Sequence, residues 1–191
     1  ASDYANKQNI HTIQKFFQEV APNEIGKFDA IHTFDVLEHV NNPIAVIEKA
    51  YSLLKKNGVI VVEVPNDFNP LQKLAQKTLK KKEWWVTLSS WSKNSGNIQH
   101  LNYFNFSSIS DLLKRTGFKI IIKESTFPLE LFLLMGQDYI KNPKIGKKIH
   151  LGRIQLEKNF EKGNAVQMKK TIYQKLAEVG IGRTAIIYAK K

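Results

Sequence analysis

Two histidines, His39 and His100, are the side chains of this chain best suited to proton transfer. His39 closes the segment Asp-Val-Leu-Glu-His, and His100 opens the segment His-Leu-Asn-Tyr-Phe. An imidazole titrates near neutral pH, so either ring could accept a proton from a reacting group. Each also has a plainer interpretation. His39 could orient its loop through hydrogen bonds to the backbone, and His100 could order or pack the loop that it begins.

The elements around His39 should place it at one edge of a sheet. Residues 28–34 form an apolar run that predicts a strand. Residues 42–56 have apolar side chains at helical spacing, and Asn57-Gly58 is the expected helix end. Residues 59–64 then predict a strand that is covered on both faces. A strand, helix and strand of this length form a βαβ unit with a right-handed crossover.

Polar residues follow both of these strands. Asp35 comes directly after the first strand, and Asn66 follows the second. In open α/β sheets, ligands lie beyond the carboxyl ends of the strands. Asn66 is therefore a candidate substrate contact, and Asp35 either contacts a ligand or caps the next turn.

The rest of the chain predicts further helices and strands. Residues 10–20 carry an apolar stripe that fits a helix but could also hold a strand. Ser107 or Ser108 is the expected cap of a helix that begins near Phe106. The remaining expectations are helices at 70–82, 106–116 and 154–178 and strands at 118–122 and 184–189.

Three segments carry a resemblance to a known family: FDAIHTFDVLEHVNNP, LLKKNG and VIVVEVPN. They resemble the second half of a class I S-adenosylmethionine-dependent methyltransferase, and D-x-L-E-H-V resembles the subgroup that methylates small molecules. The likeness continues through residues 100–122 and to the final GIGRTAIIYAKK. It implies a Rossmann-like three-layer αβα sandwich whose sheet is mostly parallel, with an antiparallel last strand. It also implies S-adenosylmethionine as cofactor and a small polar acceptor such as a sugar.

The resemblance assigns expected roles to several residues. Asp35 should lie near the methionine end of the cofactor, and Val36 and Leu37 should face it through backbone and apolar contact. The segment that begins at His100 borders the active site in similar enzymes, so Tyr103 is a second candidate substrate contact.

One part of the family pattern is absent, because no G-x-G-x-G occurs in the 191 residues. We expect that glycine-rich loop to precede Ala1, so that residues 1–191 form a single partial methyltransferase domain, inactive alone. The strand at 28–34 would then have an open edge, covered by another chain, as in a homodimer, or by residues 10–20.

Residues 67–105 differ in character from their surroundings and predict a substrate-side insertion or lid. Trp84, Trp85 and Trp91 all fall there, after a basic amphipathic helix. Such rings could exclude water and grip a substrate, with Trp84 and Trp85 as candidate contacts. They could equally pack the helix onto the body or lie on a membrane surface.

Charge and composition narrow the classes of function. Residues 1–70 hold 6 Lys and Arg against 9 Asp and Glu, a net charge of −3, whereas residues 71–191 hold 23 against 8, a net charge of +15. The basic part could be a solvated surface, could attract an anionic acceptor, or could bind nucleic acid. A non-catalytic basic module for nucleic acid or an anionic glycan is the alternative function, although we expect no specific nucleic-acid partner. An oxidoreductase-like dinucleotide domain is disfavoured, because hydride transfer does not call for D-x-L-E-H-V.

Other features bear on location and metals. The chain has no cysteine, and no apolar run is long enough for a transmembrane segment, so a cytoplasmic protein is expected. No set of His, Asp and Glu has the sequence spacing of metal ligands, so we expect no metal site.

Overall fold

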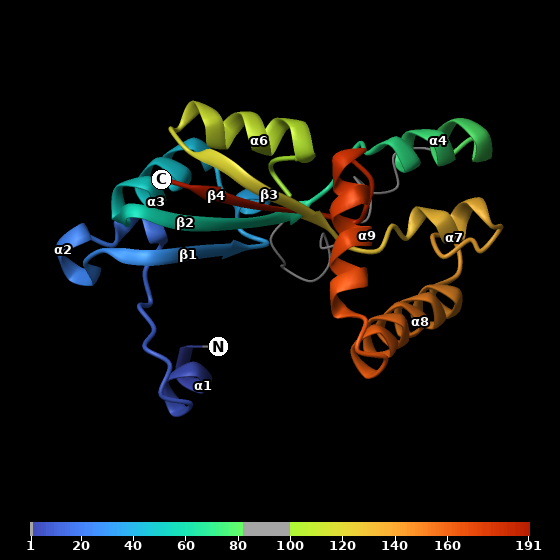
Figure 1. The fold of residues 1–191 in the computed structure, drawn as a ribbon, viewed down its shortest axis with the longest axis horizontal. Coiled ribbons are helices and arrows are strands. Elements are labelled where there is room, and N and C mark those ends of the chain that lie inside the picture. Colours follow the sequence, from blue (N-terminus) through green and yellow to red (C-terminus); the bar gives the residue numbers. More distant parts are fainter. Residues whose placement is uncertain (1, 82–99) are drawn as a thin grey trace.

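The computed structural model describes residues 2–81 and 100–191. Their strands form one mixed sheet in the order β1-β2-β4-β3. β1 (Phe28–Phe34) pairs in parallel with β2 (Leu54–Pro65), and β4 (Thr184–Lys190) runs antiparallel to both β2 and β3 (Lys119–Ser125). The predicted fold class, a mostly parallel sheet with an antiparallel last strand, is confirmed (Figure 1).

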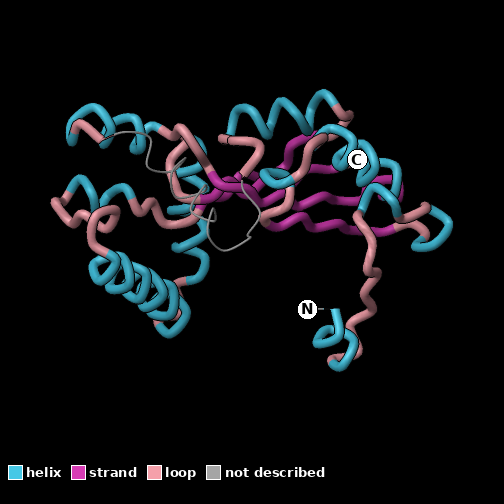
Figure 2. Tube along the Cα trace, turned by 180° about the vertical axis from the view of Figure 1, so that it is seen from behind, coloured by secondary structure: helices cyan, strands magenta, loops and turns pink. Residues whose placement is uncertain are grey.

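Two helices, α3 (Pro43–Leu53) and α6 (Phe106–Arg115), pack on one face of this sheet. The buried side chains of α3 and α6 form one core with alternate residues of β2 and β4, among them Ile60, Val62 and Ile187. β1, β2 and β3 point toward the end of the molecule where α4, α7, α8 and α9 gather (Figures 1 and 2). The helices are α1 (Ser2–Lys7), α2 (Pro22–Ile25), α3 (Pro43–Leu53), α4 (Pro70–Leu79), α6 (Phe106–Arg115), α7 (Glu130–Leu134), α8 (Pro143–Lys162) and α9 (Val166–Glu178), with 3₁₀ turns η1 (Phe17–Glu19) and η2 (Leu37–His39). None of these helices has the length and apolar character needed to span a membrane.

The crossover helix α3 begins as predicted but ends earlier. The side chain of Asn42 caps it by accepting a hydrogen bond from the Ala45 N–H at 3.1 Å. Its last residue is Leu53, so the prediction that Asn57-Gly58 ends it is wrong. Gly58 lies within β2, where a Cβ would come 3.2 Å from the Asp29 carbonyl oxygen and 3.0 Å from that of Lys55. Gly58 is therefore not a helix cap. It permits a close backbone approach between neighbouring strands.

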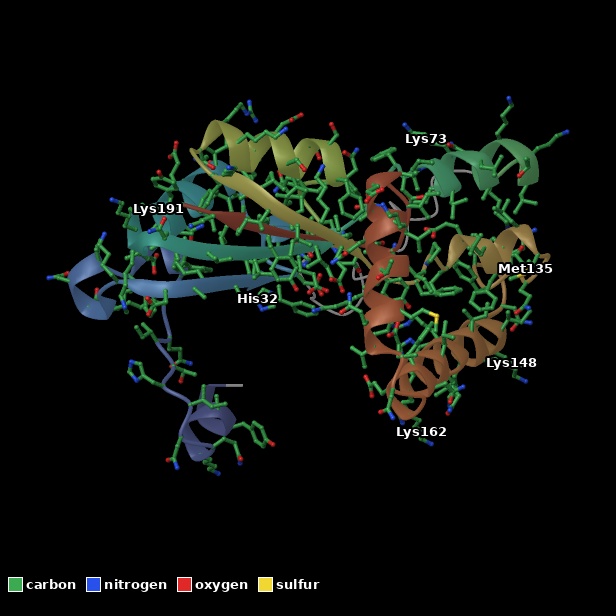
Figure 3. The ribbon with its side chains drawn as sticks, in the orientation of Figure 1. His32, Lys73, Met135, Lys148, Lys162 and Lys191 are labelled. Atoms are coloured by element: carbon green, nitrogen blue, oxygen red, sulfur yellow. The ribbon has the colours of Figure 1, made fainter. Side chains whose placement is uncertain are left out.

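The second strand is fully buried on one face and only partly covered on the other. Ile60 and Val62 have no exposed surface, whereas Val59 and Val61 on the opposite face are half-buried. The prediction of two covered faces for residues 59–64 is thus wrong for one of them. His32 of β1 is more than half exposed beside this strand (Figure 3).

Two further helix boundaries differ from the sequence expectation. The cap of α6 is Asn105, whose side chain accepts hydrogen bonds from the N–H groups of Ser107 and Ser108 at 3.0 Å. The expected helix at 154–178 is two helices, α8 and α9, separated at Gly163 and Asn164. Asn164 has a φ of +53°, a left-handed conformation that a continuous helix does not allow.

The first strand has the open edge that the sequence predicts, since β1 is the outer strand of the described sheet. Residues 10–16 form neither a helix nor a strand. Phe17 packs against the core, and residues 16–18 face β1 across an apolar pocket of about 270 Å³. Pairing of the β1 edge with another chain, as in a homodimer, stays a prediction.

Candidate functional site

The carboxyl ends of β1 and β2 lie side by side, as the βαβ unit requires. Phe34 is paired with Glu63, and the Asp35 N–H donates to the Glu63 carbonyl oxygen at 3.2 Å. Asp35 has a φ of +48° and turns the chain sharply into η2. This turn carries Glu38 and His39 to the edge of the sheet.

The segment that starts at His100 is fastened onto this turn by hydrogen bonds. The N–H groups of Leu101 and Asn102 donate to the Glu38 carbonyl oxygen at 2.7 and 3.0 Å. The Nδ2 atom of Asn102 donates to the carbonyl oxygens of Leu37 and Val40 at 3.0 and 2.7 Å. Asn102 therefore holds two segments together that are far apart in the sequence.

This clamp brings His39 and His100 into contact. Their ring centroids are 4.8 Å apart with an interplanar angle of 73°. The Glu38 carboxylate lies beside them, with its Oε1 atom 3.8 Å from Nε2 of His39. Ligand atoms of Glu38, His39 and His100 all lie within 4.8 Å of one another. Sequence spacing missed this group, because only the fold places His100 against the turn.

The Glu38 side chain is unusual for a carboxylate, because only 1% of its surface is exposed. Among the described residues neither of its oxygens has a hydrogen-bond partner. Burial raises the pKa of Glu38 to about 7, and the charge of Asp35 acts in the same direction. Sequence reasoning gave Glu38 no more than a part in the turn, since burial is not visible in a motif.

The surroundings of His100 favour its neutral form. Burial lowers its pKa, and the charge of His39 lowers it further. Its Nδ1 atom is buried and has no hydrogen-bond partner in the described part of the chain. A neutral imidazole has one ring nitrogen that can accept a proton or bind a cation.

The end of β2 adds a second buried carboxyl group, that of Asp67. Its N–H donates to the Phe104 carbonyl oxygen at 2.6 Å, and 3% of its surface is exposed. Burial raises the pKa of Asp67 to about 6, although the charge of Arg183 opposes this shift. The sequence placed Asp67 at a strand end without identifying it as a titratable group of the site.

The predicted cofactor contacts, Asp35, Val36 and Leu37, differ in how exposed their side chains are. Asp35 is exposed at the tip of β1, and Val36 is 38% exposed and lines the apolar pocket beside β1. Leu37 is fully buried in the core, so its side chain offers no surface to a ligand, and only its backbone reaches the turn.

The predicted substrate contacts also differ. Asn66 is fully buried, and its Nδ2 atom donates to the carbonyl oxygens of Gly180 and Gly182 at 3.0 and 2.9 Å, so its amide ties β2 to the loop before β4. Contact between Asn66 and an acceptor stays a prediction. Tyr103 lies near the site, its ring centroid 6.4 Å from that of His100. Trp84, Trp85 and Trp91 lie outside the described residues, as does the whole 82–99 segment of the predicted lid.

Comparison with known proteins identifies the family. A family model described as a methyltransferase domain matches residues 2–123. The chain therefore belongs to the methyltransferase-domain family, which agrees with its α/β fold and with a site at the carboxyl ends of the strands.

Individual relatives match more narrowly. Over 55 residues the chain is 36% identical to the ubiquinone biosynthesis O-methyltransferase of Histophilus somni (strain 2336). The aligned stretch covers 29% of this chain and 23% of that protein. The protein of the same name from Glaesserella parasuis serovar 5 (strain SH0165) is 34% identical over 55 residues, with the same coverage. The match thus spans less than a quarter of the length of these curated relatives.

Two solved structures resemble the whole chain. One is an S-adenosylmethionine-dependent methyltransferase of Thermotoga maritima, described as a possible histamine N-methyltransferase. Its TM-score is 0.54 at 15% identity, and the match covers 100% of this chain and 68% of the Thermotoga chain. The mycolic acid cyclopropane synthase CmaA1, solved with S-adenosylhomocysteine, has a TM-score of 0.52 at 13% identity, covering 100% and 67%. At these identities the likeness shows the fold alone.

Proposed function

We propose that this chain is the acceptor-side part of an S-adenosylmethionine-dependent methyltransferase that methylates a small polar metabolite, such as a sugar, at a hydroxyl group. The observation that carries the proposal is the contact between His39, His100 and the buried Glu38 where β1 and β2 end. The family match supports methyl transfer, and the local similarity to an O-methyltransferase favours oxygen over nitrogen as the acceptor atom.

The cofactor would lie on the side of the turn that Asp35 and Val36 form. The fit is favourable in this part: Asp35 offers an exposed carboxylate, and Val36 borders an apolar pocket of about 270 Å³. When bound, S-adenosylmethionine supplies the electrophilic methyl group. The protein must align the acceptor, exclude water and remove a proton from the hydroxyl group.

His39 and His100 are the candidate groups to accept the proton of that hydroxyl group. Burial lowers the pKa of His100 and so favours its neutral imidazole, which can accept a proton. His39 lies on the turn that leads to the cofactor side, and its ring contacts His100. We assign to His39 the orientation of the turn beneath the cofactor and to His100 the acceptor side, because His100 lies near the end of the tryptophan-bearing insertion, residues 67–105.

A transfer assay tests the proposal. The gene product that contains these residues should be incubated with methyl-labelled S-adenosylmethionine and a panel of hydroxylated acceptors: sugars, sugar phosphates and catechols. Label should enter at least one acceptor, and a His100→Ala variant should transfer it far more slowly. Transfer only to amines would overturn the choice of oxygen. A complete lack of transfer, in a protein that binds the cofactor, would overturn the function.

The charge distribution favours a second candidate, a non-catalytic basic module. Lys73, Lys148 and Lys162 are exposed on α4 and α8, which lie beyond the carboxyl ends of β1 and β2 (Figure 3). These lysines could attract an anionic acceptor or a polynucleotide. Binding of nucleic acid should be weak and should fall steeply with salt through counterion release. Sequence-selective submicromolar binding at about 150 mM salt would favour the module over the enzyme.

A further inference from the structure

We propose that Glu38, His39 and His100 form a binding site for one divalent transition-metal ion, with Zn²⁺ as the cation that the ligands match best. Two imidazole rings and one carboxylate are a donor set that proteins use for zinc and related first-row metals. The sequence predicted no such site, because its ligands are adjacent only in the folded chain.

The geometry of the three side chains is close to that of a ligand set. Their ligand atoms all lie within 4.8 Å of one another. Ligands about 2.0–2.2 Å from a shared tetrahedral zinc ion are about 3.4 Å apart. Small side-chain rotations would therefore close the group around an ion, without movement of the backbone.

The buried polar atoms provide an independent argument. Glu38 is almost completely buried, and among the described residues neither of its oxygens, nor Nδ1 of His100, has a hydrogen-bond partner. Buried polar groups in native proteins nearly always have partners, and an unpaired buried carboxylate is costly. A bound cation would satisfy these atoms together.

The backbone holds the ligands in place before any ion arrives. The Glu38 carbonyl oxygen accepts two hydrogen bonds from the 101–102 segment, and the Asn102 side chain fixes the turn on either side of Glu38. His39 and His100 are thereby carried on two segments that are bonded directly to each other. Such supporting contacts are what orient metal ligands in known sites.

The surrounding charges favour a cation. The carboxyl groups of Asp35 and Asp67 both act electrostatically on Glu38, whereas Arg183 acts on His100 and Asp67. When all three are ionised, these carboxylates outnumber the two cationic groups that act on the cluster, Arg183 and a protonated His39. The exposed lysines of α4 and α8 lie on other elements.

The chemical role of the ion rests on the proposed function. An ion with three protein ligands keeps a coordination position for a further oxygen, as in catalytic zinc sites. An acceptor hydroxyl group bound there would lose its proton more readily, because the cation stabilises the resulting alkoxide. The imidazoles would then serve as ligands in place of the proton-accepting role that a metal-free site gives to His100, and the proton of the acidified hydroxyl group would pass to solvent water.

Metal binding can be measured without any methyl donor or acceptor. After removal of metals with a chelator, the chain should be titrated with Zn²⁺, Mn²⁺ and Mg²⁺ by calorimetry. We expect one equivalent of Zn²⁺ to bind with micromolar affinity or better and Mg²⁺ to bind much more weakly. Glu38→Gln and His100→Ala should each weaken Zn²⁺ binding more than about 100-fold, since loss of mere outer-shell partners costs about 10–100-fold.

His150→Ala is the matched control, because His150 is exposed on α8. It should leave Zn²⁺ binding unchanged, and Zn²⁺ should raise the melting temperature of this variant and of the unsubstituted chain but not of His100→Ala. If Glu38→Gln does not fold, His39→Ala and His100→Ala decide the matter. Binding that survives in both histidine variants, or is absent from the unsubstituted chain, overturns the site. Zn²⁺ binding in a protein that transfers no methyl group leaves the site intact and overturns the enzyme, whereas transfer that ignores the chelator overturns the role of the ion.

Discussion

Asn102 donates a hydrogen bond from its side chain to the Val40 carbonyl oxygen at 2.7 Å, and this bond joins the loop of His100 to the turn of His39. With its second bond, to Leu37, the amide spans the whole of η2.

Removal of this clamp should loosen the site. Asn102→Ala leaves two partly buried carbonyl oxygens without their donors, which should cost about 1–3 kcal/mol in the free energy of unfolding. His100 should then lose its fixed position, and methyl transfer should fall more than stability alone explains. Urea unfolding and the transfer assay check both effects, with the exposed Asn23→Ala of α2 as control. An unaltered rate in a destabilised Asn102→Ala protein would contradict the positioning role.

The two histidines should separate cofactor from acceptor effects. His39→Ala should weaken cofactor binding, because His39 lies on the turn beside the cofactor contacts. His100→Ala should mainly raise the KM for the acceptor. Steady-state kinetics and calorimetry measure the two effects. Intact cofactor affinity in His39→Ala, with turnover lowered about 10²–10⁴-fold, would instead make His39 the catalytic base.

The buried Asp67 should make stability depend on pH. Its pKa is raised from 3.8 to about 6, so the folded chain holds the proton more tightly than the unfolded chain. Stability from this group is therefore highest below about pH 4 and falls as the pH rises to about 6. Asp67→Asn should flatten that fall and add about 1–3 kcal/mol at pH 7.

Chemical denaturation across this pH range, in the presence of chelator, measures the effect of Asp67. Asp29→Asn is the control, because its carboxylate is 85% exposed and its ion pair with Lys55 is a surface pair. A slope that Asp67→Asn does not change would show that another group controls it.

Gly182, in the loop before β4, should tolerate no side chain. Gly182 has a φ of +128°, and a Cβ there would overlap Oγ of Ser125 and lie 2.6 Å from the Thr126 carbonyl oxygen. Gly182→Ala should therefore destabilise the chain by about 2–5 kcal/mol. Gly152→Ala is the matched control, since a Cβ on that α8 residue meets nothing within 4 Å, and it should stabilise by about 0.5–1 kcal/mol. Thermal melts of the two variants give the comparison.

The 191 residues alone should bind S-adenosylmethionine weakly, because the sequence contains no G-x-G-x-G loop to approach the cofactor. Calorimetry at neutral pH measures the affinity. A dissociation constant in the low micromolar range would show that Asp35, Val36 and their neighbours suffice.

The sequence was a good guide where local chemistry decides the structure. Strong apolar runs predicted β1, β2 and β4, and the same local patterns placed Asp35 and His39 in a turn after the first strand. It failed where tertiary contacts decide. Gly58 follows a helical pattern, as a helix cap does, but in the fold it lies within β2 and allows a close approach of backbone atoms. The Glu38, His39 and His100 cluster depends on a loop from elsewhere in the chain, and burial, which sets the pKa values of Glu38 and Asp67, has no local signature.

The position of β4 between β2 and β3 has a consequence for how the chain folds. β1, α3 and β2 are contiguous in sequence and can assemble early. The other partner of β2 is β4, which comes from residues 184–190. Contacts between such distant residues require the closure of a long loop and slow the folding reaction. Until β4 arrives, β2 exposes a row of unpaired backbone groups on apolar residues, a surface prone to aggregation. Refolding yield should therefore fall as protein concentration rises, and a chaperone that shields apolar strands should restore it.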